Sequence, residues 1–484
     1  MQRLVEFLIL LCLVAANLGD SELCSKCTCY KKAVIQALYN INCSHLELHD
    51  TFPEVEQWPE YAIQQQTRMA VNFDWNEIHH LEKFPALPGI VSLSLRHNKM
   101  VKIDPKAFLQ LDNLKTLDLS HNMLTAEGLE ADVFRGPYSP KDYDPLGIVV
   151  LNLGNNQITS LSSFTFEHLP NLKELRLNNN PLKELEPSTI EALRYPETLQ
   201  VLDLAYTGLS DLPESFVHLS SLRHKLQLLY LNGNKFTQVP ESIAALGDSL
   251  EKLNLNDNPI LELDEDSFRG LLVLRELNIS AMTHLKRIGP QTFAHLKSLE
   301  ILYSSYNLKL TDLDEEAFGF ENNSLTLKEL HLRSNALHSL PQHLVQWTDL
   351  VVVDVQNNPW RCDCDIEWLV NDLVPIIQNN NPDLVLDLHC SEPLWLSGVN
   401  IQTFRNGANS PTLCAHTHKS HSAKVTHRST GLYTAFQAAS IVLVISTTVG
   451  FIVLFYLKRG TNVRITIQML INPNVRYIKT RNEV

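Results

Sequence analysis

One nine-residue phrase recurs along most of the chain, and it limits the possible folds more than any other feature. It consists of leucine, two variable residues, leucine, one variable residue, leucine, two variable residues and asparagine, as in LKTLDLSHN at 114–122 and LEKLNLNDN at 250–258. Looser copies are mostly 22 to 28 residues apart, and two of them have Thr207 and Met282 in place of the asparagine. Twelve copies at this period predict a solenoid of stacked repeats.

The spacing within the phrase predicts a strand. The central Leu-x-Leu alternates so that both leucines point inward and the residue between them points to the opposite face. One repeat cannot bury its apolar side alone, but stacked repeats bury it against one another. The asparagine carries donors and an acceptor that can satisfy backbone groups at the bend after each strand. We also expect Phe108, Phe166, Phe268 and Phe293, from a second recurring phrase, to pack in the core on the outer side.

Eight of the nine cysteines lie in two groups of four, one on each side of the repeats. The first group is Cys24, Cys27, Cys29 and Cys43, and the second is Cys362, Cys364, Cys390 and Cys414. Even numbers in an exported segment favour disulfides, although Cys24-x-x-Cys27 also has the spacing of zinc ligands. A solenoid exposes apolar core at both ends, so the two groups lie where caps are required.

These groups resemble the cysteine-rich caps of extracellular leucine-rich repeat proteins, such as Toll-type ectodomains, Slit, Nogo receptors and the Capricious, Tartan and Connectin adhesion proteins. The front cap matches as Cys24-x2-Cys27-x-Cys29-x13-Cys43, and the rear cap as NNPWRCDCDIEWL followed by Cys390 and Cys414. The resemblance covers roughly residues 24–414. It implies an α/β leucine-rich repeat solenoid, a curved parallel sheet shaped like a horseshoe. It also implies disulfides Cys24–Cys29, Cys27–Cys43, Cys362–Cys390 and Cys364–Cys414, but no particular ligand.

Two apolar runs lie outside the repeats. The first follows Arg3 and spans Leu8 to Ala16, which is typical of a secretory signal peptide. The second, Phe436 to Leu457, has 22 residues without a charge and is followed by Lys458 and Arg459. At about 1.5 Å per residue it spans a bilayer core of roughly 30 Å, and the basic flank favours a cytoplasmic C-terminal side. The sequence thus predicts a single-pass type I plasma-membrane protein with its N-terminal region outside.

The predicted organisation has seven parts. They are a signal peptide (1–19), an N-terminal cap (24–60), about twelve repeats (61–358), a C-terminal cap (359–414), a flexible stalk (415–431), a transmembrane helix (432–457) and a short basic tail (458–484).

Charge narrows the choice of partner. The formal net charge is −14, and the tail contributes +5, which leaves about −19 on the exported part. This balance argues against nucleic acid as a partner. The tail is too short for a kinase, phosphatase or death-type domain, and its basic residues favour contact with anionic lipid and a possible cytoplasmic adaptor.

Residues of the predicted concave face provide the candidate binding site. Apolar and aromatic side chains that face solvent on a sheet are enriched in interaction patches. We expect a contact patch of Val201, Tyr206, Leu228 and Tyr230, with Arg176 and Asp203 at its rim. Cross-strand packing that only stabilises the sheet is an equally good interpretation.

Three acceptor sites for N-glycosylation occur, at Asn42, Asn278 and Asn322. Asn278 lies between the two inward positions of its phrase, so a glycan there would lie on the concave face; the alternative is an unused site. If it is occupied, the sugar covers the C-terminal half of that face and leaves the middle open.

The sequence offers no chemistry of catalysis. It contains no Gly-x-Ser-x-Gly, His-Glu-x-x-His or P-loop motif, and we expect no enzyme, cofactor or metal. The favoured function is a cell-surface receptor or adhesion protein that binds an extracellular protein on its concave face and signals through partners. The alternative is a co-receptor that regulates another membrane receptor or an extracellular ligand.

Overall fold

The computed structural model describes residues 21–32, 38–138, 144–319 and 326–405, which all belong to one compact unit of the chain. The predicted signal peptide, stalk, transmembrane helix and tail lie outside these residues, as do Cys414 and Asn322. Within the described ranges, no helix is both long enough and apolar enough to cross a membrane.

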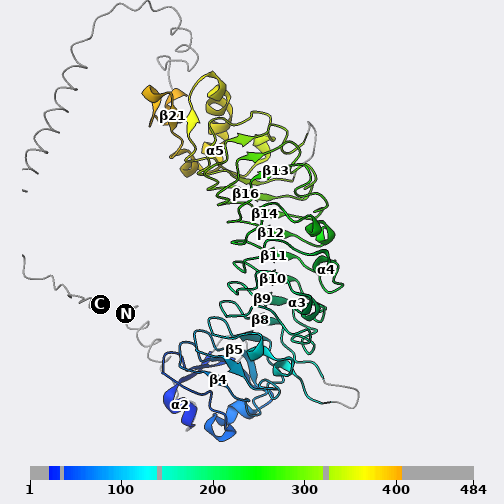
Figure 1. The fold of residues 1–484 in the computed structure, drawn as a ribbon. Coiled ribbons are helices and arrows are strands. Elements are labelled where there is room, and N and C mark those ends of the chain that lie inside the picture. The colour runs from blue at the N-terminus through cyan, green and yellow to red at the C-terminus, as the bar shows by residue number, and fades with distance from the viewer. Residues whose placement is uncertain (1–20, 33–37, 139–143, 320–325, 406–484) are drawn as a thin grey trace, which may run out of the picture. The chain divides into compact units, whose positions relative to one another are not determined.

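Each of the twelve phrases forms one strand, as predicted, and the strands stack side by side in a curved row (Figure 1). All of these strands are parallel, and the register places leucine beside leucine, for example Leu117 opposite Leu151 and Leu202 opposite Leu229. The strands are β3 (Arg68–Asn72), β5 (Ile90–Ser94), β7 (Thr116–Asp118), β8 (Val150–Asn152), β9 (Glu174–Arg176), β10 (Val201–Asp203), β11 (Leu228–Tyr230), β12 (Lys252–Asn254), β14 (Glu276–Asn278), β16 (Ile301–Tyr303), β18 (Glu329–His331) and β19 (Val352–Asp354).

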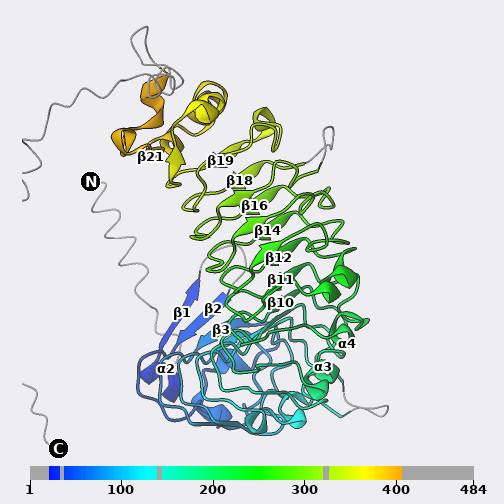
Figure 2. The same ribbon diagram turned by 45° about the horizontal axis from the view of Figure 1, so that its top comes forward.

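The N-terminal cap extends this sheet by two strands that the repeat phrase does not predict. β1 (Thr28–Lys32) pairs antiparallel with β2 (Leu38–Asn42), and β2 pairs parallel with β3. A short helix, α2 (Glu22–Lys26), precedes them. The cap therefore covers the first repeat by continuing its sheet (Figure 2).

The outer side contains less helix than the predicted α/β class implies. On this side, several repeats contain a strand of only two residues. These strands are β4 (His80–Leu81), β6 (Lys102–Ile103), β13 (Glu262–Leu263), β15 (Arg287–Ile288) and β17 (Asp312–Leu313). The short helices α3 (Pro187–Ala192) and α4 (Glu214–Val217) occur in the two 27-residue repeats that end at Thr207 and Asn234. The 24-residue repeat that ends at Asn258 has a 3-10 helix, Glu241–Leu246, in place of an α-helix.

Phenylalanines form the outer layer of the core, as predicted. Phe108, Phe166, Phe268 and Phe293 are all buried. The Phe108 and Phe134 rings stack with centroids 5.9 Å apart, and the Phe268 and Phe293 rings stack at the same distance. Aromatic side chains bury the largest apolar areas, so these rows join successive repeats on the side opposite the sheet.

Most of the phrase asparagines make the hydrogen bonds expected of them, and Asn258 is typical, whereas Asn307 Nδ2 donates to the Ser304 hydroxyl instead of a carbonyl. Asn258 Nδ2 donates to the carbonyls of Leu231 and Leu255 at 3.0 and 2.8 Å. Its Oδ1 accepts the amide of Phe236 at 3.2 Å. One buried side chain thus satisfies backbone groups of two successive repeats.

The two exceptional repeats replace this network in different ways. The Thr207 hydroxyl donates to the Leu204 carbonyl at 2.7 Å, which keeps one of the bonds. Met282 cannot form such bonds, but it is fully buried and fills the same space with an apolar side chain. Its amide is held by Asn307 Oδ1 at 2.8 Å.

Disulfides close both caps. The structure contains Cys24–Cys29, Cys27–Cys43 and Cys362–Cys390, the same pairs that the resemblance implies. Cys364 is also disulfide-bonded, and its proposed partner Cys414 lies outside the described residues. In the C-terminal cap, α5 (Val374–Asn380) contacts β19, and β20 (Trp360–Arg361), which holds the fully buried Trp360, pairs with β21 (Cys390–Glu392).

We predict that Asn258→Ala lowers the free energy of unfolding by about 2–4 kcal/mol, because it leaves buried backbone donors and acceptors unpaired. Urea denaturation followed by circular dichroism measures the change. Asn256→Ala is the matched control, since Asn256 is half-buried and its side chain is not part of this network; we expect it to cost less than about 0.5 kcal/mol. Equal losses for the two variants would contradict the assigned role of the buried amide.

Candidate functional site

Five of the six predicted binding residues lie on three neighbouring strands, β9 to β11. Val201 is in register with Leu228, and Asp203 lies between Arg176 and Tyr230. Val201, Asp203, Leu228 and Tyr230 are half-buried, and Arg176 is exposed. The structure therefore assembles an apolar pair beside a row of polar and aromatic side chains on the strand face.

The role of Arg176 and Asp203 as the rim of a contact patch stays a prediction. Both occupy the same register column as Tyr230, because each stands between the two inward leucines of its phrase. Arg176 pairs with Glu174 on its own strand, with its Nε 2.6 Å from Oε1. Asp203 accepts the amide of Ala205 at 3.0 Å. Burial raises the pKa of the Asp203 carboxyl, and the Ala205 amide and the Arg176 charge oppose that shift.

Tyr206 lies beyond the end of β10, and not on the strand face. It has a left-handed backbone (φ 55°) and is 47% exposed. A Cβ added to Gly233 in the next repeat would lie 2.1 Å from two Tyr206 ring carbons, so the ring rests directly on that glycine. The Tyr206 hydroxyl then donates to Asp257 Oδ2, one repeat further, at 3.3 Å.

A shallow hollow adjoins the other side of Tyr206. Its lining consists of Asn179, Asn180, Pro181, Lys183, Tyr206, Thr207, Gly208 and Lys235. No acidic side chain lines it, and within the described part of the chain neither lysine side chain has an ion-pair partner. The hollow is therefore a locally basic site on a predominantly acidic protein.

Sequence reasoning missed this hollow. Its residues lie at the asparagine position of three successive repeats or within three residues of it, whereas the predicted patch consists mainly of strand residues. One signal was present: when the repeats are aligned on their last residue, Tyr206 and Gly233 occupy the same position in adjacent copies. A large ring beside a residue without a side chain predicts that the ring folds over its neighbour.

Asn278 lies on the strand face, as predicted. It is half-buried on β14, in register between Asn254 and Tyr303, and its Oδ1 accepts the Ser280 amide at 3.0 Å. Asn42 is exposed on β2. Glycosylation at these positions stays a prediction.

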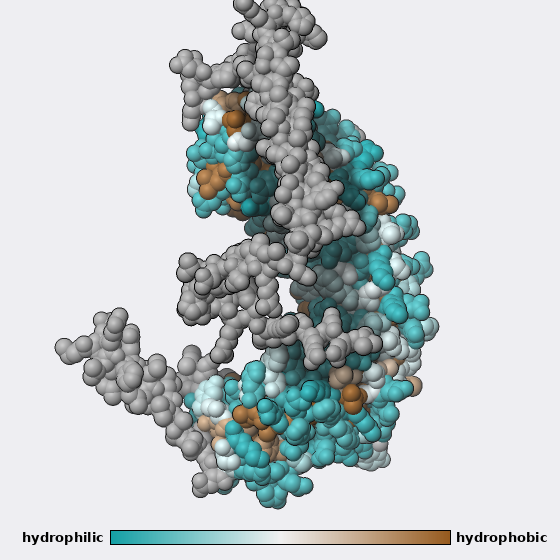
Figure 3. All heavy atoms as spheres, turned by 60° about the vertical axis from the view of Figure 1, so that its left-hand side comes forward, coloured by the Kyte–Doolittle hydropathy of each residue, from teal (hydrophilic) through white to brown (hydrophobic). Residues whose placement is uncertain are grey.

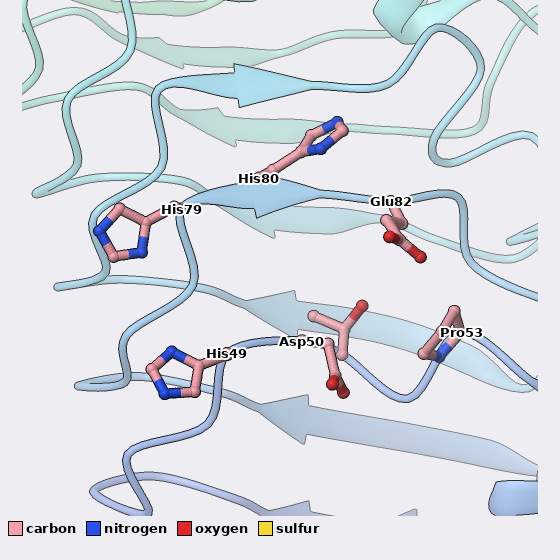
Figure 4. A pocket seen from close by; sticks show the side chains of 7 residues that line it. His49, Asp50, Pro53, His79, His80 and Glu82 are labelled. Atoms are coloured by element: carbon pink, nitrogen blue, oxygen red, sulfur yellow. The ribbon is translucent and has the colours of Figure 1, made fainter.

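A second hollow lies where the N-terminal cap meets the outer side of the first repeats. It is lined by His49, Asp50, Thr51, Pro53, His79, His80 and Glu82 (Figure 4). His80 is paired with Asp104 at 2.8 Å, and His79 Nδ1 is 2.7 Å from the Glu77 carbonyl. Across the described ranges, no group of three or more histidine, cysteine, aspartate or glutamate side chains could hold a metal ion.

The surface seen from the left of Figure 1 is mostly hydrophilic where it is described (Figure 3). Apolar residues gather near the two ends of the described part in this view (Figure 3). The C-terminal cap has two strongly exposed apolar side chains, Leu394 at 88% and Trp395 at 74%. The candidate site on β9 to β11 combines an exposed Arg176 with Val201 and Leu228, whose side chains are half-buried.

We predict that Gly233→Ala destabilises the protein more than Gly208→Ala does. Both glycines have a positive φ, at 67° and 81°, so each substitution carries a backbone penalty of about 1–2 kcal/mol. Only at Gly233 does the new Cβ strike a ring, whereas at Gly208 the nearest atom is 3.8 Å away. Thermal unfolding measures the difference. In a Tyr206→Ala background the two costs should become similar, and an unchanged difference there would contradict the contact.

Comparison with known proteins supports the repeat assignment. The leucine rich repeat family matches residues 76–137 and 224–285, and a family of two leucine rich repeats matches 148–190. Podocan of Mus musculus is 29% identical over 58% of this chain, and Tsukushi of Gallus gallus is 29% identical over 54% of it. The chain spans only 47% of that podocan and 59% of that Tsukushi.

Lumican of Rattus norvegicus is 31% identical over 54% of this chain, and the match covers 78% of lumican. These similarities agree with the prediction that the chain is not an enzyme. The chain therefore belongs to the leucine-rich repeat proteins, as a relative of lumican.

Proposed function

We propose that residues 21–405 are the extracellular binding domain of a cell-surface protein, and that this domain docks another extracellular protein on its strand face. The observation that carries the proposal is the assembly of Val201, Asp203, Leu228 and Tyr230 beside a hollow with two lysines that lack an ion-pair partner among the described residues. The cap disulfides support an oxidising compartment, where such bonds persist.

The side chains favour a partner of particular chemistry. Val201 and Leu228 offer apolar contact at the centre, and Tyr230 and Tyr206 add aromatic area with hydroxyl groups, a combination that is enriched at binding hot spots. Lys183 and Lys235 at the edge favour a carboxylate on the partner, since complementary charges speed association and fix register. The contact segment of the partner is thus an apolar stretch next to an acidic residue.

The size of the patch sets a further requirement. Three strands at about 4.8 Å spacing cover roughly 10 Å of the sheet, whereas a stable interface buries about 800 Å² on each partner. The partner must therefore contact additional strands. β7 and β8 are available on the N-terminal side, while a glycan at Asn278 would obstruct β12 to β16.

Anchoring in the membrane is part of the same proposal and rests on the uncharged run from Phe436 to Leu457. With that span, the basic tail faces the cytoplasm, touches anionic lipid and recruits an adaptor. Alkaline extraction of cells that express the full-length chain tests it, because an integral protein stays with the membranes and a peripheral or secreted one is released.

The cellular role is proposed as receptor or adhesion, with the co-receptor as the alternative. Cells that display an adhesion molecule bind to each other or to partner cells. A co-receptor instead changes the response of another receptor to its ligand without cell binding. Proximity labelling on living cells, followed by binding of purified protein to the proteins identified, supplies the partner for the tests below.

We predict that the double substitution Tyr206→Glu and Tyr230→Glu weakens partner binding by about tenfold or more, because it places charges in a contact that excludes water. Surface plasmon resonance with the identified partner measures the affinity. Tyr306→Glu is the matched control: Tyr306 has the same backbone conformation at the equivalent position of a later repeat and is 55% exposed. Unchanged binding by a well-folded double variant would mean that the patch only packs the sheet.

We predict that Asn278→Gln removes one glycan and leaves partner affinity within about twofold of the wild type. Intact mass spectrometry of protein from secretory cells shows the loss of the sugar, and the same binding measurement gives the affinity. A gain in affinity of tenfold after removal of the sugar would place the partner on β12 to β16 and contradict the proposed site.

A further inference from the structure

Four aromatic rings form a continuous stack at the N-terminal end of the repeats. Centroid distances are 5.6 Å from His45 to Trp75, 3.7 Å from Trp75 to His97 and 4.0 Å from His97 to His121, with interplanar angles of 20° or less. We call these four residues the ring ladder. Three of them directly precede the asparagine of their repeat, and all four have a positive φ, between 52° and 60°.

The backbone fixes the spacing of the ring ladder. The Trp75 amide donates to the Arg96 carbonyl at 2.9 Å, the His97 amide to Ser120 at 3.2 Å and the His121 amide to Gly154 at 3.0 Å. These hydrogen bonds fix the distance between the backbones of successive repeats. Two stacked rings can therefore separate only if a side chain rotates out of the stack. His45 and Trp75 are exposed, whereas His97 and His121 are half-buried.

Three charged side chains face the two inner histidines. They are Asp74 from the preceding repeat, Arg96 beside His97 and Asp118 from the following repeat. Asp74 already accepts the Ser94 hydroxyl at 2.5 Å and the Arg96 amide at 2.9 Å. Asp118 accepts hydrogen bonds from the Ser120 hydroxyl at 2.6 Å and from the Asn152 side-chain amide at 3.1 Å. Arg96 Nε lies 3.7 Å from the Asp118 carboxylate.

We propose that the ring ladder is a proton-sensitive switch, closed while its histidines are neutral and opened when His97 and His121 both take up protons. One imidazolium beside Trp75 is tolerated, because a cation is attracted to the face of an indole. A second imidazolium, with its ring centroid 4.0 Å away, faces a like charge. Among the described residues, neither Asp74 nor Asp118 forms an ion pair with either ring, and Asp118 is 3.7 Å from Arg96 Nε instead.

The groups around His97 and His121 indicate that the ring ladder opens at acidic pH. Burial lowers the pKa of His97, helped by the charges of His121 and Arg96 and opposed by those of Asp74 and Asp118. Burial likewise lowers the pKa of His121, helped by Arg96 and opposed by Asp118. Both folded-state pKa values lie below the ordinary histidine pKa of about 6.5. Both rings are therefore neutral, and the stack is complete, above that pH. The contribution of the stack to the free energy of unfolding is lost as the pH falls through the lowered pKa values of the two histidines.

The test uses the full-length chain labelled with 5-fluorotryptophan, in which Trp75→Phe assigns the Trp75 signal in the fluorine NMR spectrum. Between pH 7.5 and 5 we expect this signal to shift with a midpoint below 6.5. His97→Phe keeps a ring in the stack but cannot take up a proton, so the shift should fall at least about threefold, and His121→Phe should act in the same direction. His224→Phe, at an exposed histidine beside Asp248 in a later repeat, should leave the shift unchanged.

Thermal unfolding of the same proteins gives a second readout. The melting temperature of the wild type should drop more between pH 7.5 and 5 than that of His97→Phe. A Trp75 signal that is constant over this range, or one that shifts equally in the wild type and in both phenylalanine variants, would overturn the proposal. The test needs no knowledge of the binding partner, so its outcome is independent of the proposed function.

Discussion

The structure depends on the buried asparagine amide that ends ten of the twelve repeat phrases. A chain that turns sharply after every strand leaves backbone donors and acceptors inside the solenoid, where water cannot reach them. The asparagine side chain satisfies those groups in its own repeat and in the previous one, as the bonds of Asn258 to Leu231, Leu255 and Phe236 show. Because each amide joins two repeats, it also fixes the register in which they stack.

Fixed register turns sequence positions into columns on the surface. Asp203 lies between Arg176 and Tyr230 because all three stand between the inward leucines of their phrases. Trp75, His97, His121 and Tyr206 share a different column, just before the last residue of each phrase, where the backbone is left-handed. The surface of this protein is therefore organised by repeat position, so residues far apart in sequence become neighbours at about 4.8 Å intervals.

The sequence predicted what depends on periodicity. Twelve strands, their parallel order, the buried leucines and the core phenylalanines all follow from the spacing of apolar residues, and so does the grouping of Val201 with Leu228. It failed where the outcome depends on side-chain direction. The contact of Tyr206 with Gly233 and the stacking of His97 on Trp75 require the left-handed bend just before the last residue of the phrase. The strands β1 and β2 have no phrase to reveal them, and among the described residues of the repeats the α-helices that an α/β class implies are only α3 and α4.

The reach of Tyr206 has a consequence for how such a chain can change over evolutionary time. Solenoids gain and lose whole repeats readily, because each normally contacts only its neighbours. Tyr206, however, crosses the Gly233 repeat to bond Asp257. Deleting the middle repeat, or duplicating it, would leave the ring over a residue other than glycine or the hydroxyl without its carboxylate. These three repeats are therefore expected to be inherited as a block, while the rest of the array is free to vary in number.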